Sequence, residues 1–356
     1  MTNLKLNVGE WSELFCILYL TNHRKLVICD SNLNKITDEI FTVESIKTNE
    51  NVSFELGEFD TNIISDQDGN LIKHKIPNQT LSEYANLLLS YIQNHKKGEG
   101  SFSATQIYNF LKSNIGDVAI KSPSSEKSDI FLNNIDHLRQ NTLVELGYSI
   151  KSNLGSSPTL LNASKHTNFK YEVSGITKAD ADSINSISTR TKLLDRISKI
   201  REKKGKIAFV GLESDSFRKN LQIIDSNLPN LLGNALLYSY EFNNKNLKDI
   251  FERSNKDYDQ NFLVKKLCDF LSDFSFYYFP SKVFSAIKDA YGGFIVIKKN
   301  GEVSVLDLVY HKAEVLNYLL NNTVLDSPSS SRYDMLHLQQ VGSKFEFTLN
   351  LQVRFK

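Results

Sequence analysis

The chain has 356 residues, of which 40% are hydrophobic and 11% aromatic, enough for a packed core, and this excludes a largely disordered protein. Its 42 lysines and arginines nearly balance 41 aspartates and glutamates, which excludes a polybasic or acidic tail protein but not a local basic groove. Three scattered cysteines suit a reducing compartment, and no apolar run reaches the ~18 residues of a membrane span, so we expect a cytoplasmic protein without a membrane partner.

Helices and short strands are expected in the first third of the chain. Four apolar residues at helical spacing predict a helix over about residues 9–21: Trp11, Leu14, Phe15 and Leu18. Short strands and two further helices are expected after it, over residues 25–65, 81–92 and 104–114. A polar connector at 121–128 then separates an N-terminal region, 1–120, from a second region, 121–356, which we expect to hold the catalytic core and the recognition elements.

A β-hairpin is expected next, with strands over about residues 129–138 and 142–152. If the hairpin turns around Gln140, antiparallel pairing sets Asp129 opposite Lys151 and Phe131 opposite Ser149, within two residues of register. The hairpin therefore brings a carboxylate and an ammonium group toward each other.

The rest of the chain continues to mix strands and helices. Strands are expected over 165–173, 206–211 and 344–355, and helices over 178–203, 228–242 and 263–274. The stretch GGFIVIKKNGEVSVLDL predicts a second hairpin, with Asn300-Gly301 in its turn. The fold class is therefore α/β (α+β), a mixed central sheet flanked by helices.

The facing pair Asp129 and Lys151 suits a metal-dependent phosphodiesterase. A carboxylate holds Mg²⁺, and an ammonium group orients or deprotonates the attacking water and offsets charge on the phosphate. A cross-strand salt bridge is the alternative interpretation. No phosphate-binding loop, HExxH or CxxC motif offers a competing chemistry.

A second carboxylate is expected in the first helix. Glu13 lies on its apolar arc and Glu10 borders that arc. A desolvated carboxylate is costly unless it is paired or binds a cation. The alternative is an exposed glutamate on a different helix face.

The region after the hairpin has features that suit a polyanion. Fourteen basic residues face seven acidic ones between residues 151 and 220. Such a surplus can neutralise several phosphates, although a solvated helix would look the same. Polar residues that suit phosphate and base-edge contacts follow Lys151 directly: Ser152, Asn153, Asn162, Ser164, Lys165 and Asn168.

Taken together, these stretches resemble the HpaII-type type II restriction endonucleases. The matching pieces span nearly the whole chain: GEWSELFCILYL, SDIFL, GYSIKSNLGSSPTLLNASKHTNFKYEV, DSPSSSRYD and FTLNLQVRF. The resemblance implies a PD-(D/E)xK nuclease fold and Mg²⁺-dependent cleavage of double-stranded DNA at a short palindrome, CCGG for the HpaII type. It also implies a companion methyltransferase that protects the same site without forming a stable complex.

Carried over by position, the motif's aspartate falls on Asp129 and its lysine on Lys151. Ser149 occupies the second acidic position, and a serine cannot supply an anionic metal ligand. Some enzymes of this fold recruit a carboxylate from another element, which makes Glu13 the leading candidate and Glu10 the second. The number of metal ions stays open.

Reading a G·C-rich target calls for arginine or lysine on guanine, supported by asparagine. Arg332 and the loop 162–168 are the candidates. A symmetric target favours a homodimer, although a monomer can nick the two strands in succession. The competing functions are a DNA-binding protein of this fold without catalysis, a nuclease of another specificity, and a different mechanism, either histidine-based metal hydrolysis around His166 and Asn168 or glycosidic base excision.

Overall fold

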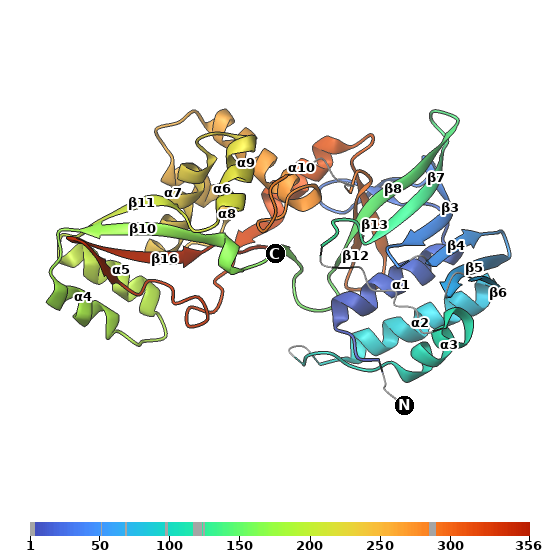
Figure 1. Cartoon of the computed structure of the whole chain (residues 1–356). Helices are drawn as coiled ribbons and strands as arrows, with labels where there is room; N and C mark the ends of the chain where they lie inside the picture. Colours follow the sequence, from blue (N-terminus) through green and yellow to red (C-terminus); the bar gives the residue numbers. More distant parts are fainter. Residues whose placement is uncertain are drawn as a thin grey trace. The chain divides into compact units, whose positions relative to one another are not determined.

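A computed structural model describes residues 4–50, 52–67, 70–96, 99–116, 123, 125–284 and 290–356. The chain forms two compact units (Figure 1): the first combines residues 1–158 and 288–318, and the second combines 159–287 and 319–356. This division differs from the boundary expected at residue 120, because the strands of the 129–152 hairpin pair into a sheet with strands of the first 77 residues. The predicted connector at 121–128 lies partly outside the described residues.

The first unit is built on a ten-stranded mixed sheet. Its strand order is β2-β1-β13-β12-β8-β7-β3-β4-β5-β6, in which β1–β13 and β12–β8 are parallel pairs and the other neighbours are antiparallel. The strands are β1 (Ile28–Cys29), β2 (Lys35–Thr37), β3 (Phe41–Thr48), β4 (Val52–Leu56), β5 (Asp60–Gln67), β6 (Asn70–Pro77), β7 (Ile130–Asp136), β8 (Asn141–Ser152), β12 (Gly293–Ile297) and β13 (Val303–Asp307).

Three helices cover this sheet in Figure 1: α1 (Val8–Asn22), α2 (Asn78–Asn94) and α3 (Thr105–Ile115). The α1 helix begins at a capping box, in which Asn7 and Glu10 bond each other's backbone N–H groups. It packs against both α2 and β8, so it is buried on more than one side. The predicted apolar stripe of this helix is confirmed, since Trp11, Leu14, Phe15 and Leu18 are all buried.

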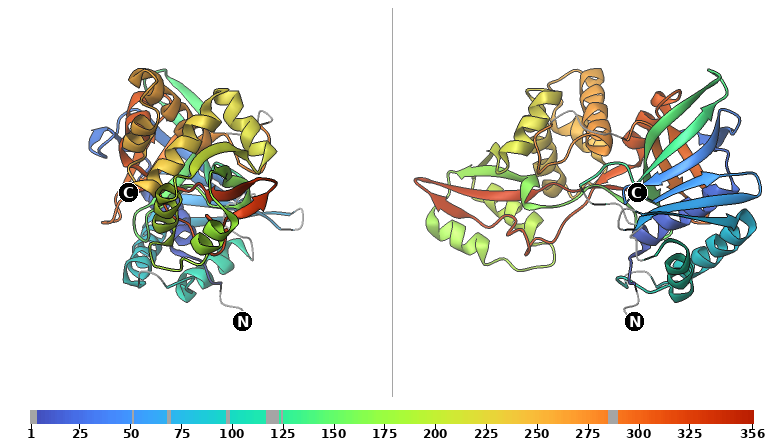
Figure 2. Two further views of the ribbon diagram at one scale, coloured as in Figure 1. Left: turned by 90° about the vertical axis from the view of Figure 1, so that its left-hand side faces the viewer. Right: turned by 45° about the vertical axis from the view of Figure 1, so that its right-hand side comes forward.

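The second unit has two smaller sheets, ordered β11-β10-β16-β15 and β14-β17-β9. Figures 1 and 2 show α4 and α5 on one face of the first of these sheets and α6 to α9 on the other. The strands are β9 (Thr159–Leu161), β10 (Asn168–Ser174), β11 (Lys206–Leu212), β14 (Thr323–Leu325), β15 (Gln339–Val341), β16 (Lys344–Asn350) and β17 (Val353–Phe355). The helices are α4 (Lys178–Asn185), α5 (Lys192–Glu202), α6 (Asp215–Ile224), α7 (Leu228–Glu241), α8 (Leu247–Ser254) and α9 (Gln260–Phe276).

The sequence interpretation needs correction at several elements. The single helix expected over 178–203 is two helices, α4 and α5, separated by a stretch rich in serine and threonine, whose side chains compete for backbone hydrogen bonds. The single closing strand is two strands in different sheets, β16 and β17. Short helices α6 and α8, and α10 (Lys312–Asn322), were not anticipated. The second hairpin is confirmed, and its turn holds Gly301 at φ 88°, where glycine avoids strain.

Candidate active site

The β7–β8 hairpin places the predicted catalytic residues. Ile130 pairs with Tyr148, and the Asp129 N–H donates to the Tyr148 carbonyl at 2.8 Å. Asp129 is therefore two residues away from the expected register opposite Lys151, which is within the predicted tolerance. The difference arises because the turn is centred before Gln140, with Asp136 paired to Asn141 across it, which shifts the pairing by three residues; a bulge beyond Leu132 then restores one of them.

A serine links the two charged groups. One carboxylate oxygen of Asp129, Oδ2, accepts from the Ile150 N–H at 2.5 Å and from Ser149 Oγ at 3.3 Å. The Lys151 Nζ donates to the same Ser149 Oγ at 2.7 Å. Asp129, Ser149 and Lys151 thus form one hydrogen-bonded cluster, in which Ser149 bridges the aspartate and the lysine.

Burial dominates the electrostatics of the cluster. It raises the pKa of Asp129, although Lys151 and the hydrogen bonds from Ile150 and Ser149 act in the opposite direction. Burial also lowers the pKa of Lys127 to about 7, with a contribution from repulsion by Lys151. Lys127 was not predicted from the sequence as part of this cluster. Its position two residues before Asp129 was the signal that could have indicated it. In the absence of a ligand, the ionised Asp129 carboxylate and the protonated Lys127 ammonium group are therefore both costly at this site.

The first helix lies against the same end of β8. The Ser12 hydroxyl donates to the Val8 carbonyl, and its oxygen lies 2.8 Å from Ser152 Oγ, next to Lys151. Burial raises the pKa of the Cys16 thiol, and the charges of Asp129 and then Glu13 raise it further. The two carboxylates expected to share a metal therefore both act on the charge balance of one thiol, although they are far apart in the sequence.

Glu10 has a different environment from Glu13. Its Oε2 accepts from the Asn7 N–H at 2.8 Å, which closes the capping box of α1. This contact gives Glu10 a structural role at the start of the helix.

The donor set fits Mg²⁺. No group of three or more histidine, cysteine, aspartate or glutamate side chains that could hold a metal occurs among the described residues. Mg²⁺ is commonly held by only one or two carboxylates, with waters and substrate phosphates completing its octahedron. Asp129 and Glu13 are the two carboxylates predicted from the sequence for a site of that kind.

Comparison with known proteins decides the class. The model of the HpaII restriction endonuclease family matches residues 7–355. The chain belongs to the HpaII restriction endonuclease family. It is 36% identical over 359 residues to the type II restriction enzyme HpaII of Haemophilus parainfluenzae, with 98% of each chain covered. No solved structure matches it.

Family membership fixes the broad activity. The chain is a type II site-specific deoxyribonuclease, and its substrate is double-stranded DNA. In the part of the chain that the structure describes, no helix has the length and apolarity needed to cross a membrane.

The expected DNA-contacting residues of this restriction endonuclease divide between its two units. Ser152 ends β8 in the first unit and Asn153 follows it, where the Asn153 N–H donates to the Ile297 carbonyl at 2.9 Å. In the second unit, the Tyr333 hydroxyl donates to the Ala163 carbonyl at 3.0 Å. This bond joins the two loops predicted to read DNA, whose exposed members are Asn162, Lys165 and Arg332.

Two residues of these loops have structural roles instead. Asn168 is only 8% exposed, and its Nδ2 donates to Glu213 Oε2 at 2.7 Å while its Oδ1 accepts from Asn350 Nδ2 at 2.5 Å. Both ends of the Asn168 amide are used internally, so the predicted contact of Asn168 with a base would require these bonds to break. The Ser164 hydroxyl accepts from the His166 N–H at 3.1 Å and caps a short 3₁₀ turn.

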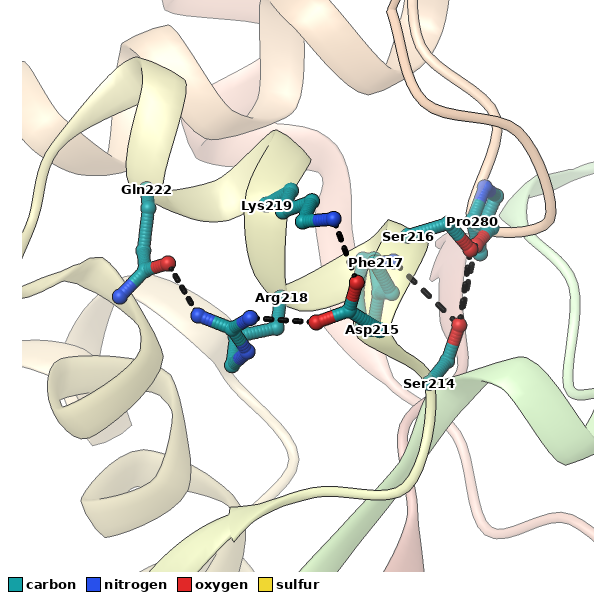
Figure 3. Close-up of polar contacts among 8 residues, drawn as sticks. All are labelled: Ser214, Asp215, Ser216, Phe217, Arg218, Lys219, Gln222 and Pro280. Atoms are coloured by element: carbon teal, nitrogen blue, oxygen red, sulfur yellow. Dashed lines mark hydrogen bonds and ion pairs between the residues drawn. The ribbon is translucent and has the colours of Figure 1, made fainter.

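The basic surplus of residues 151–220 is partly neutralised. Figure 3 shows the clearest case, at the start of α6, where Arg218 and Lys219 both pair with Asp215. Ion pairs also hold Lys170, Lys199, Arg201 and Lys203. Within the described residues, no ion pair engages the following basic side chains of this stretch: Lys165, Lys178, Arg190, Lys192, Lys204 and Lys206.

Replacing Asp129 by asparagine is expected to stabilise the metal-free enzyme. A raised folded-state pKa means that the carboxyl contributes stability below its unfolded pKa and loses it as pH rises through the folded pKa. At pH 8 Asp129→Asn removes this cost, and a gain of about 2–4 °C in Tm would correspond to about 1 kcal/mol. The advantage should shrink as the pH falls.

Thermal unfolding in EDTA across pH measures this effect. Asp136→Asn on the same hairpin is the matched control with the opposite sign. Although burial opposes it, hydrogen bonds from Tyr310 and from the Arg139 and Leu138 N–H groups lower the pKa of Asp136. Lower stability of Asp129→Asn than of the wild type at pH 8 would contradict the prediction.

Proposed function

We propose that this restriction endonuclease is a PD-(D/E)xK enzyme that uses Mg²⁺ to cut double-stranded DNA at the palindrome CCGG. The observation that carries the mechanism is the cluster of Asp129, Ser149 and Lys151 at the end of a β-hairpin, with α1 packed beside it. The target is proposed from the relative named HpaII, which is similar along nearly its whole length.

In this mechanism, Asp129 and Glu13 would hold the metal, and water attacks the scissile phosphate in line with the leaving 3′ oxygen. Bound Mg²⁺ would polarise the phosphate and stabilise the leaving oxygen. The Ile150 N–H and the Ser149 hydroxyl orient the Asp129 carboxylate. Lys151 stabilises the charge that develops on the phosphoryl oxygens and positions the nucleophile, while its bond to Ser149 fixes the direction of its Nζ.

The symmetric target favours a homodimer in which each protomer cuts one strand. A companion methyltransferase would protect the same sequence in host DNA. Both enzymes would then act on DNA in the cytoplasm. Sedimentation with and without a CCGG duplex distinguishes this dimer from a monomer that nicks the strands in succession.

Digestion of a mapped plasmid tests the proposal. Purified protein with Mg²⁺ should give discrete fragments whose sequenced ends map to CCGG, and EDTA or prior CpG methylation should prevent cleavage. An intact plasmid combined with retarded migration of a CCGG duplex would favour a DNA-binding protein without catalysis. Fragment ends at another sequence would favour a nuclease of different specificity.

Arg332 is proposed to read guanine. Its side chain is exposed on the loop held by Tyr333, and its guanidinium lies 5.5 Å from the Tyr333 ring centroid. Arg332→Ala should weaken binding of cognate DNA by about 1–3 kcal/mol and leave random DNA little affected. Fluorescence anisotropy with both duplexes measures this, with the exposed Lys178→Ala as control. Equal losses on both duplexes would assign Arg332 to a phosphate instead.

A further inference from the structure

A cavity of about 240 Å³ lies within the second unit, and part of its lining, Asp326, Ser327, Pro328 and Ser330, belongs to the loop that carries Arg332. Its walls come from the start of α5, the end of α7 with the turn that follows, and the segment after β14. Three cationic side chains line it, namely Arg190, Lys192 and Lys245. These residues have no role in the mechanism proposed above.

The cavity has an excess of positive charge. Among the described residues, no carboxylate pairs with any of its three cations. Asp326 is the carboxylate in the lining, and it pairs with Arg354, whose Nε lies 3.1 Å from its Oδ2. The negative charge of Asp326 is therefore compensated by Arg354, which is not part of the lining.

The start of α5 adds hydrogen-bond donors. The N-cap residue Thr191 does not cap the helix with its side chain, and its hydroxyl donates to Asp195 Oδ2 at 3.0 Å. Within the described residues, the N–H groups of Leu193 and Leu194 consequently donate no hydrogen bond, and both residues line the cavity. Such N–H groups at a helix start favour an anion. Asp195 itself is not part of the lining.

Tyr240 supplies an independent observation. It is 9% exposed and lines the cavity, and its buried hydroxyl has no hydrogen-bond partner of acceptable geometry in the described residues. Burial raises its pKa to about 12, although nearby Ser327 acts in the opposite direction, so the group is a protonated donor at neutral pH. A buried donor left without a partner is costly, which indicates that an acceptor completes this site.

We propose that the cavity binds a phosphate group through Arg190, Lys192, Lys245, the N–H groups at the start of α5 and the Tyr240 hydroxyl. An oxyanion satisfies the cations, the helix N–H groups and the tyrosine at once. A backbone phosphate of the bound DNA is one source, and that source rests on the proposed function. Free phosphate is the other source of the same chemistry.

The first experiment uses inorganic phosphate alone, at constant ionic strength set with chloride. Phosphate should raise the Tm of the wild-type enzyme by about 2 °C or more. The double variant Arg190→Gln/Lys192→Gln should lose this shift, and Tyr240→Phe, which keeps the positive charge, should reduce it. Lys206→Gln is the matched control, because Lys206 is an exposed, unpaired lysine outside the cavity.

The second experiment measures DNA affinity against salt concentration for the same proteins, in Ca²⁺ or EDTA so that DNA is not cut. If the source is DNA, the double variant should lower the slope of log K against log [salt] by about 1 on cognate and random duplexes alike. If the source is free phosphate, the slope stays unchanged while the phosphate-induced Tm shift is lost.

The proposal is overturned if the double variant matches the wild type in both experiments. It is also overturned if Lys206→Gln reproduces both effects, since general charge would then explain them. Neither readout uses cleavage, so failure of the phosphate site is distinguished from failure of the nuclease assignment by the plasmid digest.

Discussion

Lys151→Ala is expected to reduce the rate of DNA cleavage by about 10²–10³-fold or more, the range seen when a preorganised charge-stabilising donor is removed. The Lys151 Nζ is held by Ser149 Oγ at 2.7 Å and is the charge that most opposes the rise in the pKa of Asp129. Loss of Lys151 therefore removes the cation that would stabilise the charge developing on the phosphate. It also makes ionisation of the Asp129 carboxylate more costly.

Specific binding should survive this substitution, because the residues proposed to read the target lie in the other unit. Single-turnover cleavage and anisotropy with a CCGG duplex in Ca²⁺ separate the two effects. Lys47→Ala is the matched control, since Lys47 lies in the same sheet but forms an exposed pair with Glu145, Nζ to Oε1 at 2.7 Å. If Lys151→Ala retained more than a few per cent of the cleavage rate, Lys151 would have no essential role.

The hairpin could be predicted from the sequence because strand pairing follows local rules. Alternating side chains and a polar turn limit the register to a few choices, and the predicted pairing of Asp129 differs from the observed one by two residues. The bulge beyond Leu132 could not be predicted, since it depends on how the hairpin fits against β3. Ser149 stood out as a departure from the motif, but its bridging position required the structure.

Long-range contacts explain where the sequence interpretation and the structure differ. Asn168 looks like an exposed loop amide, yet its partners Glu213 and Asn350 lie 45 and 182 residues away. The compact units differ from the boundary expected at 120 for the same reason, since the 129–152 hairpin and residues 288–318 join the first unit. The burial pattern of α1 was predictable, but its position against β8 was not.

Glu13→Gln is expected to raise the Mg²⁺ concentration needed for half-maximal cleavage by at least about tenfold, as loss of a metal-site contact typically does. The substitution keeps the size of the side chain and removes its charge. Glu13 lies near enough to Cys16 to raise the pKa of that thiol, as Asp129 does, and Ser12 beside it contacts Ser152 at the end of β8. We therefore propose that a carboxylate from α1 replaces the acid that Ser149 cannot supply.

Mg²⁺ titrations of single-turnover cleavage measure this requirement for the wild type, Glu13→Gln and Glu10→Gln. Glu10→Gln is the matched control, because glutamine at that position still completes the capping box with Asn7. Saturating Mg²⁺ should restore part of the rate of Glu13→Gln, since Asp129 is retained. An unchanged metal requirement in Glu13→Gln would make Glu13 a structural residue, and a raised requirement in Glu10→Gln alone would transfer the ligand role to Glu10.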